Sequence, residues 1–160
     1  MCGIVCYVGN SKAKPLLVEG LKRLEYRGYD SSGVAIQDAN KMDYYRAVGK
    51  IAELEKKING LEINGTTGIA HTRWATHGEP TEKNAHPHSD MEEKIFVIHN
   101  GIIENYATLK KHLIDRGVTF KSETDTEVLV NLIDHLYIEG GFSAEQAISF
   151  ALNRVKGAYG

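Results

Sequence analysis

The sequence predicts a fold of the α+β class, formed by one domain that spans residues 1–160. Apolar, β-branched runs of strand length alternate along the chain with segments whose apolar residues recur at helical spacing. Two strand-like segments, 34–37 and 44–48, are joined through residues 38–40 and predict a hairpin. A hairpin is antiparallel, so it argues against a purely parallel sheet. No internal repeat or low-complexity segment interrupts this pattern.

The first half of the chain predicts a buried strand, a helix, the hairpin, a short helix and a further strand. The first strand is residues 2–8, and the last is residues 68–71. Between them the apolar stripes define the two helices: Leu17, Leu21 and Leu24 in one, and Ile51, Leu54 and Ile58 in the other. Polar sequence then continues from Thr72 to about Asp90, and connections of this length are usually functional or disordered.

The second half predicts a buried strand, three helices and two short strands. The strand over 94–99 is followed by Asn100-Gly101, a dipeptide that most often forms a tight turn. Asn105 is expected to cap the next helix, and residues 118–120 to form a short strand. Two further helices begin with capping-box patterns, at residues 124–127 and 143–146. A last strand is expected to begin at residues 157–160.

Composition and charge exclude several classes of function. The formal net charge is −2 and there is no basic run, which argues against nucleic acid as a partner. No signal peptide or apolar run of membrane-spanning length is present. Cys2 and Cys6 on one strand would lie roughly 13 Å apart, too far for a disulfide, so we expect a reduced, cytoplasmic protein. The seven histidines follow no zinc-site spacing, and no metal is expected.

Cys2 follows Met1 directly, and this position suggests a nucleophile. Removal of Met1 would place a thiol and a free α-amine on one residue. Their ordinary pKa values, about 8.5 and about 7.7–8.0, are matched for proton exchange near neutral pH. A nucleophile with its own base is the logic of N-terminal nucleophile hydrolases. The alternative is that Cys2 only begins a buried strand, as a small hydrophobic residue.

Six separated segments together resemble the class II glutamine amidotransferases, and among them the N-terminal glutaminase domain of the glucosamine-6-phosphate synthases. The resemblance covers essentially the whole chain, and amidophosphoribosyltransferases are more distant relatives. The segments are Cys2-Gly-Ile-Val5, Arg23–Gly33, Gly68–Pro80, Asn84–His88, His99–Asn105 and Ser122–Glu127.

The resemblance implies an N-terminal nucleophile hydrolase fold, a four-layer sandwich of antiparallel sheets between helices. It implies hydrolysis of the glutamine side-chain amide to glutamate and ammonia through a thioester, with L-glutamine as substrate and no cofactor. In the full-length enzymes a sugar-isomerase domain passes the ammonia to fructose 6-phosphate. That domain is absent from residues 1–160, so the chain is expected to be truncated at its C-terminal end. A homodimer is a possible assembly.

The resemblance also implies roles for single residues. Cys2 is the nucleophile, and Asn100 and Gly101 stabilise the oxyanion. Arg73 binds the α-carboxylate of glutamine and Asp125 binds its α-ammonium, although an acid at this position also suits the first turn of a helix. Further substrate contacts are implied for Thr76, His77 and His86, and a gating role in ammonia passage for Trp74, which is otherwise a packing residue.

Two alternatives stay open on the sequence alone. The chain could be a folded fragment that binds glutamine or serves a structural role without turnover. It could also be an enzyme of the same superfamily that feeds ammonia to another acceptor. One departure from the family pattern is Cys6, where glycine is usual; on a strand it shares a face with Cys2.

Overall fold

The computed structural model describes residues 2–39, 41–74 and 78–160. They form an α+β fold, as the sequence predicts. The chain divides into two compact units, Met1–Pro87 and His88–Gly160. The four-layer arrangement stays a prediction. None of the helices in the described ranges is long and apolar enough to cross a membrane.

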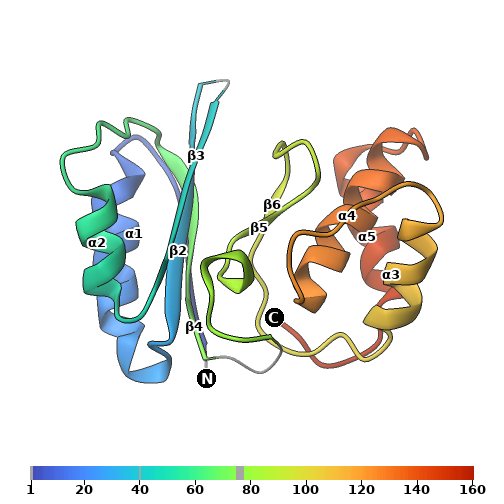
Figure 1. Ribbon diagram of the computed structural model, residues 1–160. Helices are drawn as coiled ribbons and strands as arrows, with labels where there is room; N and C mark the ends of the chain where they lie inside the picture. Colours follow the sequence, from blue (N-terminus) through green and yellow to red (C-terminus); the bar gives the residue numbers. More distant parts are fainter. Residues whose placement is uncertain (1, 40, 75–77) are drawn as a thin grey trace. The chain divides into compact units, whose positions relative to one another are not determined.

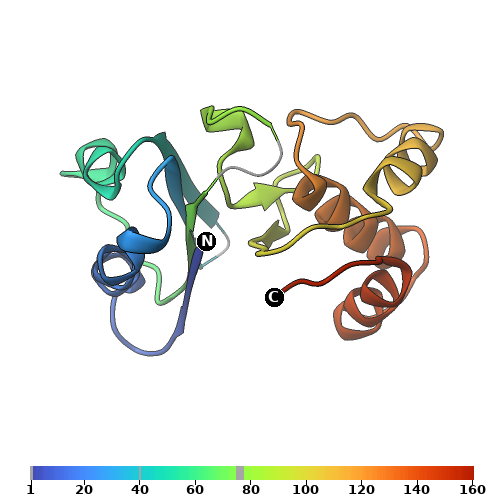
Figure 2. The same cartoon turned by 90° about the horizontal axis from the view of Figure 1, so that it is seen from below.

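The first unit is built on a four-stranded sheet in the order β1-β4-β2-β3, with every neighbouring pair antiparallel. Figures 1 and 2 show α1 and α2 together on one face of this sheet. The elements are β1 (Gly3–Val8), α1 (Ala13–Leu24), the 3-10 turn η1 (Glu25–Arg27), β2 (Ser31–Asp38), β3 (Lys41–Val48), α2 (Ile51–Ile58), β4 (Thr67–Arg73) and the 3-10 turn η2 (Glu82–Asn84).

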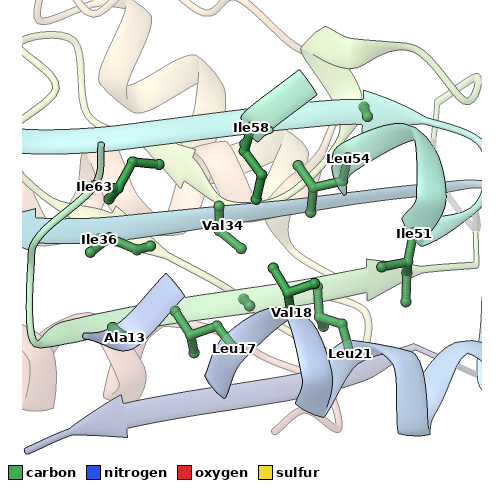
Figure 3. Packing of buried hydrophobic residues seen from close by; sticks show 12 residues of the cluster. Ala13, Leu17, Val18, Leu21, Val34, Ile36, Ile51, Leu54, Ile58 and Ile63 are labelled. Atoms are coloured by element: carbon green, nitrogen blue, oxygen red, sulfur yellow. The ribbon is translucent and has the colours of Figure 1, made fainter. Parts of the chain in front are cut away.

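The core of the first unit lies between the two helices and the sheet (Figure 3). Leu17 and Leu21 of α1 are fully buried, as their helical spacing predicts, whereas Leu24 is only half-buried. From α2 the three predicted residues, Ile51, Leu54 and Ile58, all enter this core. Burying one such side chain contributes about 1.5–3 kcal/mol, so the stripes hold both helices on the sheet.

The hairpin is confirmed, and it is longer than predicted, because β2 and β3 pair from Ser31 with Val48 to Asp38 with Lys41. The strand prediction for residues 2–8 is also confirmed, but its burial is wrong. β1 is an edge strand, and only one of its faces turns toward the helices. Cys6 is therefore exposed on the other face, and Val8 at the strand end is 81% exposed. Cys2 and Cys6 are free thiols, as predicted.

The second unit is mainly helical and has its own apolar core. Its elements are β5 (His88–Ser89), β6 (Phe96–Val97), α3 (Tyr106–Ile114), α4 (Asp125–Ile138) and α5 (Ala144–Arg154). The predicted strand over 94–99 shrinks to the two half-buried residues of β6. The strand predicted at 118–120 is wrong: Val118 and Phe120 pack against the core from a loop.

The three helix starts of this unit use their capping residues differently. Ser143 and Gln146 form the complete predicted box at α5. At α4, the Thr124 side chain accepts from the N–H of Glu127, but the Glu127 carboxylate does not return the bond. It binds the residues before the helix, as described below. Asn105 occupies the N-cap of α3 without capping it, because its amide donates to the Arg154 carbonyl and accepts from the N–H of residue 156.

Residues 100–104 run antiparallel to residues 156–160. Asn100 and Gly160 exchange both backbone hydrogen bonds, at 2.9 and 2.8 Å, and the N–H of Glu104 donates to the Lys156 carbonyl at 2.8 Å. A tight turn at Asn100-Gly101 is therefore wrong, because the segment is extended and paired. The pairing fits the prediction that a strand begins near residue 157.

Candidate functional site

Cys2 immediately precedes β1, and the sheet register brings it next to the end of β4. Gly3 pairs with Thr72, so Cys2 falls opposite Arg73. The N–H of Trp74 donates to the Cys2 sulfur at 3.2 Å, and the thiol donates to the Trp74 carbonyl at 3.6 Å. Because paired residues of an antiparallel sheet share a face, Cys2 and Arg73 both lie on the face opposite the helices.

Arg73 is a buried cation, with 4% of its surface exposed. Its two terminal nitrogens donate to the carbonyls of Gly78 and Glu79, at 3.2 and 3.4 Å. The Asn84 amide donates to the same Glu79 carbonyl at 3.0 Å. Arg73 and Asn84 therefore hold the polar connection after β4 beside the nucleophile candidate. Thr76 and His77 lie outside the described residues.

The segment before β2 is hydrogen-bonded to the last two residues of β4. The Thr72 hydroxyl donates to the Gly28 carbonyl, and the N–H of Asp30 donates to the Arg73 carbonyl at 3.2 Å. A Cβ on Gly28 would lie 2.8 Å from the same Arg73 carbonyl oxygen, so the close approach requires glycine. The resemblance assigned no role to Gly28, and only its place in the Arg23–Gly33 motif pointed to it.

Trp74 is 49% exposed and does not behave as a core residue. Its ring meets Tyr29 edge to face, with the centroids 5.6 Å apart. The packing alternative for Trp74 is therefore limited to this one aromatic pair among the described contacts.

His86 lies on the same sheet face as Cys2 and Arg73. Its ring is buried against His71 of β4, with centroids 4.1 Å apart. Its carbonyl oxygen would lie 2.2 Å from a Cβ on Gly33, so the backbone rests directly on β2. Sequence reasoning missed His71, although its position two residues before Arg73 on a strand places both on one face.

In the second unit, Asn100 and Gly101 stand on the extended segment 100–104. The N–H groups of residues 100, 102 and 104 face the segment 156–160. Backbone N–H groups alternate along a strand, so the N–H of Gly101 points to the other side. No hydrogen bond among the described residues uses it. Gly101 has φ +138°, and a Cβ there would lie 2.3 Å from the Ala158 carbonyl oxygen.

Asp125 is the first residue of α4 and is 5% exposed. Its Oδ2 accepts from the N–H of Ile103 at 2.8 Å. Ile103 is two residues beyond Gly101, so its N–H points to the same side as that of Gly101. The carboxylate therefore ties α4 to segment 100–104 on the side where the Gly101 N–H is directed.

His99, which sequence reasoning did not assign, lies beside this group. Its Nδ1 is 3.1 Å from the Thr126 hydroxyl, and its buried Nε2 has no hydrogen-bond partner among the described residues. Burial lowers the pKa of His99, and the nearby Asp125 charge opposes that shift in part. The imidazole is thus held neutral near physiological pH. The described part of the chain holds no group of three or more His, Cys, Asp or Glu side chains placed to bind a metal ion.

The comparisons with known proteins agree on one class. The family model described as "Glutamine amidotransferase domain" matches residues 55–148. The chain is 57% identical over 99% of its length to the glutamine–fructose-6-phosphate aminotransferase [isomerizing] of Bacteroides thetaiotaomicron, and 54% identical to that of Pyrococcus horikoshii. It superimposes on the glutamine phosphoribosylpyrophosphate amidotransferase of B. subtilis with a TM-score of 0.84 at 28% identity, covering 99% of this chain and 34% of that one.

The chain therefore belongs to the class II glutamine amidotransferase family, and its sequence corresponds to the N-terminal glutamine amidotransferase domain of the glutamine–fructose-6-phosphate aminotransferases. The chain spans about a quarter of those relatives, 26% of the length of each.

Proposed function

We propose that this domain hydrolyses the side-chain amide of L-glutamine to glutamate and ammonia. The observation that carries the proposal is that the Gly101 N–H and the Asp125 carboxylate lie on one side of segment 100–104. Positions two residues apart on a strand are separated by roughly 7 Å. In extended glutamine the α-nitrogen and the amide carbon are four bonds, or about 5 Å, apart. With a hydrogen bond at each end, one glutamine spans both groups.

The proposed nucleophile is the Cys2 thiolate, formed when the free α-amine of Cys2 takes the thiol proton. The sulfur attacks the amide carbon, and the carbonyl π electrons move to oxygen. The carbon–nitrogen bond then breaks, and the protonated α-amine gives its proton to the leaving ammonia. Water hydrolyses the resulting γ-glutamyl thioester to glutamate and regenerates the thiol. The Trp74 N–H, 3.2 Å from the sulfur, stabilises negative charge there.

The oxyanion of the tetrahedral intermediate is assigned to the Gly101 N–H and the Asn100 side chain. A donor is useful in this role when it is already oriented and not engaged elsewhere. The Gly101 N–H meets that condition, since the pairing with residues 156–160 fixes the backbone while using only the alternate N–H groups. One such donor contributes about 3 kcal/mol to the barrier reduction.

Substrate recognition is assigned by charge. Arg73 would bind the α-carboxylate through its guanidinium, while the 78–79 carbonyls hold its plane. Asp125 would bind the α-ammonium, although the Ile103 N–H already uses one of its oxygens and gives the residue a structural role as well. Thr76, His77 and His86 are proposed as further contacts, and Trp74 as the gate for ammonia.

We further propose that the ammonia is passed to fructose 6-phosphate on a sugar-isomerase domain. This rests on the names of relatives of which the chain spans 26%. The homodimer and the cytoplasmic location remain predictions from the sequence.

The test is intact mass and peptide mapping after incubation with an electrophilic glutamine analogue, such as a diazoketone. We expect one adduct, on Cys2, in chains that lack Met1, with glutamate release from L-glutamine. Cys2→Ala should lose both, whereas Cys6→Ala, four residues along β1, is the matched control and should keep both. Adduct without turnover would favour the glutamine-binding alternative. Turnover retained in Cys2→Ala would refute the mechanism.

A further inference from the structure

The second unit carries a groove that the proposed reaction does not use. It lies among α3, α4 and α5, has a cavity volume of about 620 Å³, and falls within the size range of small-molecule sites. Figure 2 shows these three helices side by side. Four basic side chains line the groove: His112, Arg116, His135 and Arg154.

Two of these cations lack a counter-ion. Among the ion pairs of the described residues, none involves Arg116 or Arg154. The acids nearby are Asp115, next to Arg116, and Glu139, whose carboxylate is 3.2 Å from the Nδ1 of His135. Arg116 and Arg154 therefore line the groove without an ion-pair partner among the described residues, so an anion there would gain two charge-assisted contacts.

The hydrogen bonding of His112 fixes which ring nitrogen carries the proton. Arg116 is 2.9 Å from His112 Nδ1, and a guanidinium can only donate, so this nitrogen accepts. The proton of the neutral ring is then on Nε2. Partial desolvation and the charges of Arg116, His135 and Arg154 lower the pKa of His112, while Asp115 opposes the shift. An anion in the groove would offset these charges and favour protonation.

The rest of the lining is apolar and limits the kind of ligand. Leu109, Leu132, Leu136 and Phe142 contribute to the same groove as the four basic groups. An inorganic anion would leave this apolar surface uncovered. A dianionic head attached to a ring or other apolar body would meet both parts of the lining.

We propose that this groove binds a small phosphate monoester, with the phosphate on Arg116, Arg154 and His112 and the apolar body against Phe142 and the leucines. A guanidinium binds a carboxylate or a phosphate through a pair of parallel hydrogen bonds, but a carboxylate has two oxygens, whereas the three terminal oxygens of a phosphate monoester can meet Arg116, Arg154 and His112 together. The groove is separate in sequence and lining from Asn100, Gly101 and Asp125.

The experiment is a titration of the full chain with phenyl phosphate at pH 8 and constant ionic strength. Binding is monitored by calorimetry and by the NMR signals of the His112 and His135 imidazole rings. We expect saturable binding that is at least about fivefold tighter than that of inorganic phosphate, because the phenyl ring adds apolar burial. Arg154→Gln and Arg116→Gln should each weaken binding at least about fivefold. Lys111→Gln removes an exposed charge from α3 outside the groove and should change the affinity for phenyl phosphate by less than about twofold.

The proton linkage is measured with sulfate, which stays a dianion throughout the range. Sulfate binding should tighten from pH 8 to pH 6 as His112 protonates, and His112→Gln should reduce this dependence. Equal weakening by Lys111→Gln and Arg154→Gln would overturn the proposal, because it would show that the anion responds to the overall positive charge of this surface and not to a specific site. So would saturation by an acidic peptide but not by phenyl phosphate, or equal affinity for phenyl and inorganic phosphate.

Discussion

Replacement of Glu127 by glutamine should destabilise the second unit by more than a first-turn acid normally contributes. Glu127 is 4% exposed, and its carboxylate accepts three hydrogen bonds from the segment that leads into α4. The N–H of Lys121 binds Oε1 at 2.7 Å, and the N–H and hydroxyl of Ser122 bind Oε2 at 2.7 and 2.5 Å. In Glu127→Gln, one oxygen becomes an NH₂ group that faces a backbone donor.

The magnitude follows from these contacts. A hydrogen bond to a charged group contributes about 1.5–3 kcal/mol, and a buried donor left unsatisfied costs about 1–3 kcal/mol. Removing a buried charge recovers part of this through desolvation. We therefore expect a loss of about 2–4 kcal/mol in the free energy of unfolding. At about 2–4 °C per kcal/mol for a chain of this size, the Tm should fall by roughly 4–16 °C.

The assay is urea and thermal unfolding, with amide hydrogen exchange at Lys121 and Ser122 as the local readout. The matched control is Glu145→Gln, an exposed acid in the first turn of α5 that should cost only about 0.3–1 kcal/mol. If Glu127→Gln loses no more stability than Glu145→Gln, or leaves exchange at residues 121–122 unchanged, the three hydrogen bonds do not act as described.

Three further results are expected. Arg73→Lys should raise the KM for L-glutamine by about tenfold or more, through loss of the bidentate guanidinium contact. With 4-aminobutanamide, which lacks the α-carboxylate, the variant and the parent should have the same KM. An equal rise in KM for both substrates would refute the assignment of Arg73 to the α-carboxylate. Gly101→Ala should speed amide exchange at Ile102 and Gly160, since the added Cβ would lie 2.3 Å from the Ala158 carbonyl oxygen; unchanged exchange there would contradict the close approach. Because burial lowers the pKa of His99, the unfolded state binds its proton first, so stability should fall as the pH drops below about 6.5. In His99→Gln that fall should be smaller, and an identical pH profile would show that His99 does not contribute to it.

Local signals predicted the elements of the first unit well, because each element has a clear period and a clear end. The stripe Ile51, Leu54, Ile58 and the positive φ of Gly60, +75°, define α2 as the sequence suggested. The burial of β1 could not be predicted, because an apolar strand looks the same at the edge of a sheet as at its centre. Val8 is exposed because it ends an edge strand and lies on the face that turns away from α1 and α2.

In the second unit the errors come from side chains that bind distant backbone groups. Asn105 has the composition of a cap, yet it binds residues 154 and 156, some fifty positions away. Asn100-Gly101 has the composition of a turn, yet residues 156–160 pair with it. No local pattern reports such partners. The site residues, Gly101 among them, came from the resemblance, and the geometry adds the direction of the Gly101 N–H and its shared side with Asp125.

The contact between Gly33 and His86 has a consequence for how the chain tolerates mutation. The His86 carbonyl would lie 2.2 Å from a Cβ at position 33, so even one methyl group would push two backbones apart. The same Cβ would lie 2.8 Å from the Tyr45 carbonyl oxygen of β3, so alanine at this position would strain the β2–β3 pairing as well as displace the segment that carries His86. In a saturation library, position 33 should therefore accept only glycine, and the stability of the sheet and the function of the segment that lies on it should be lost together.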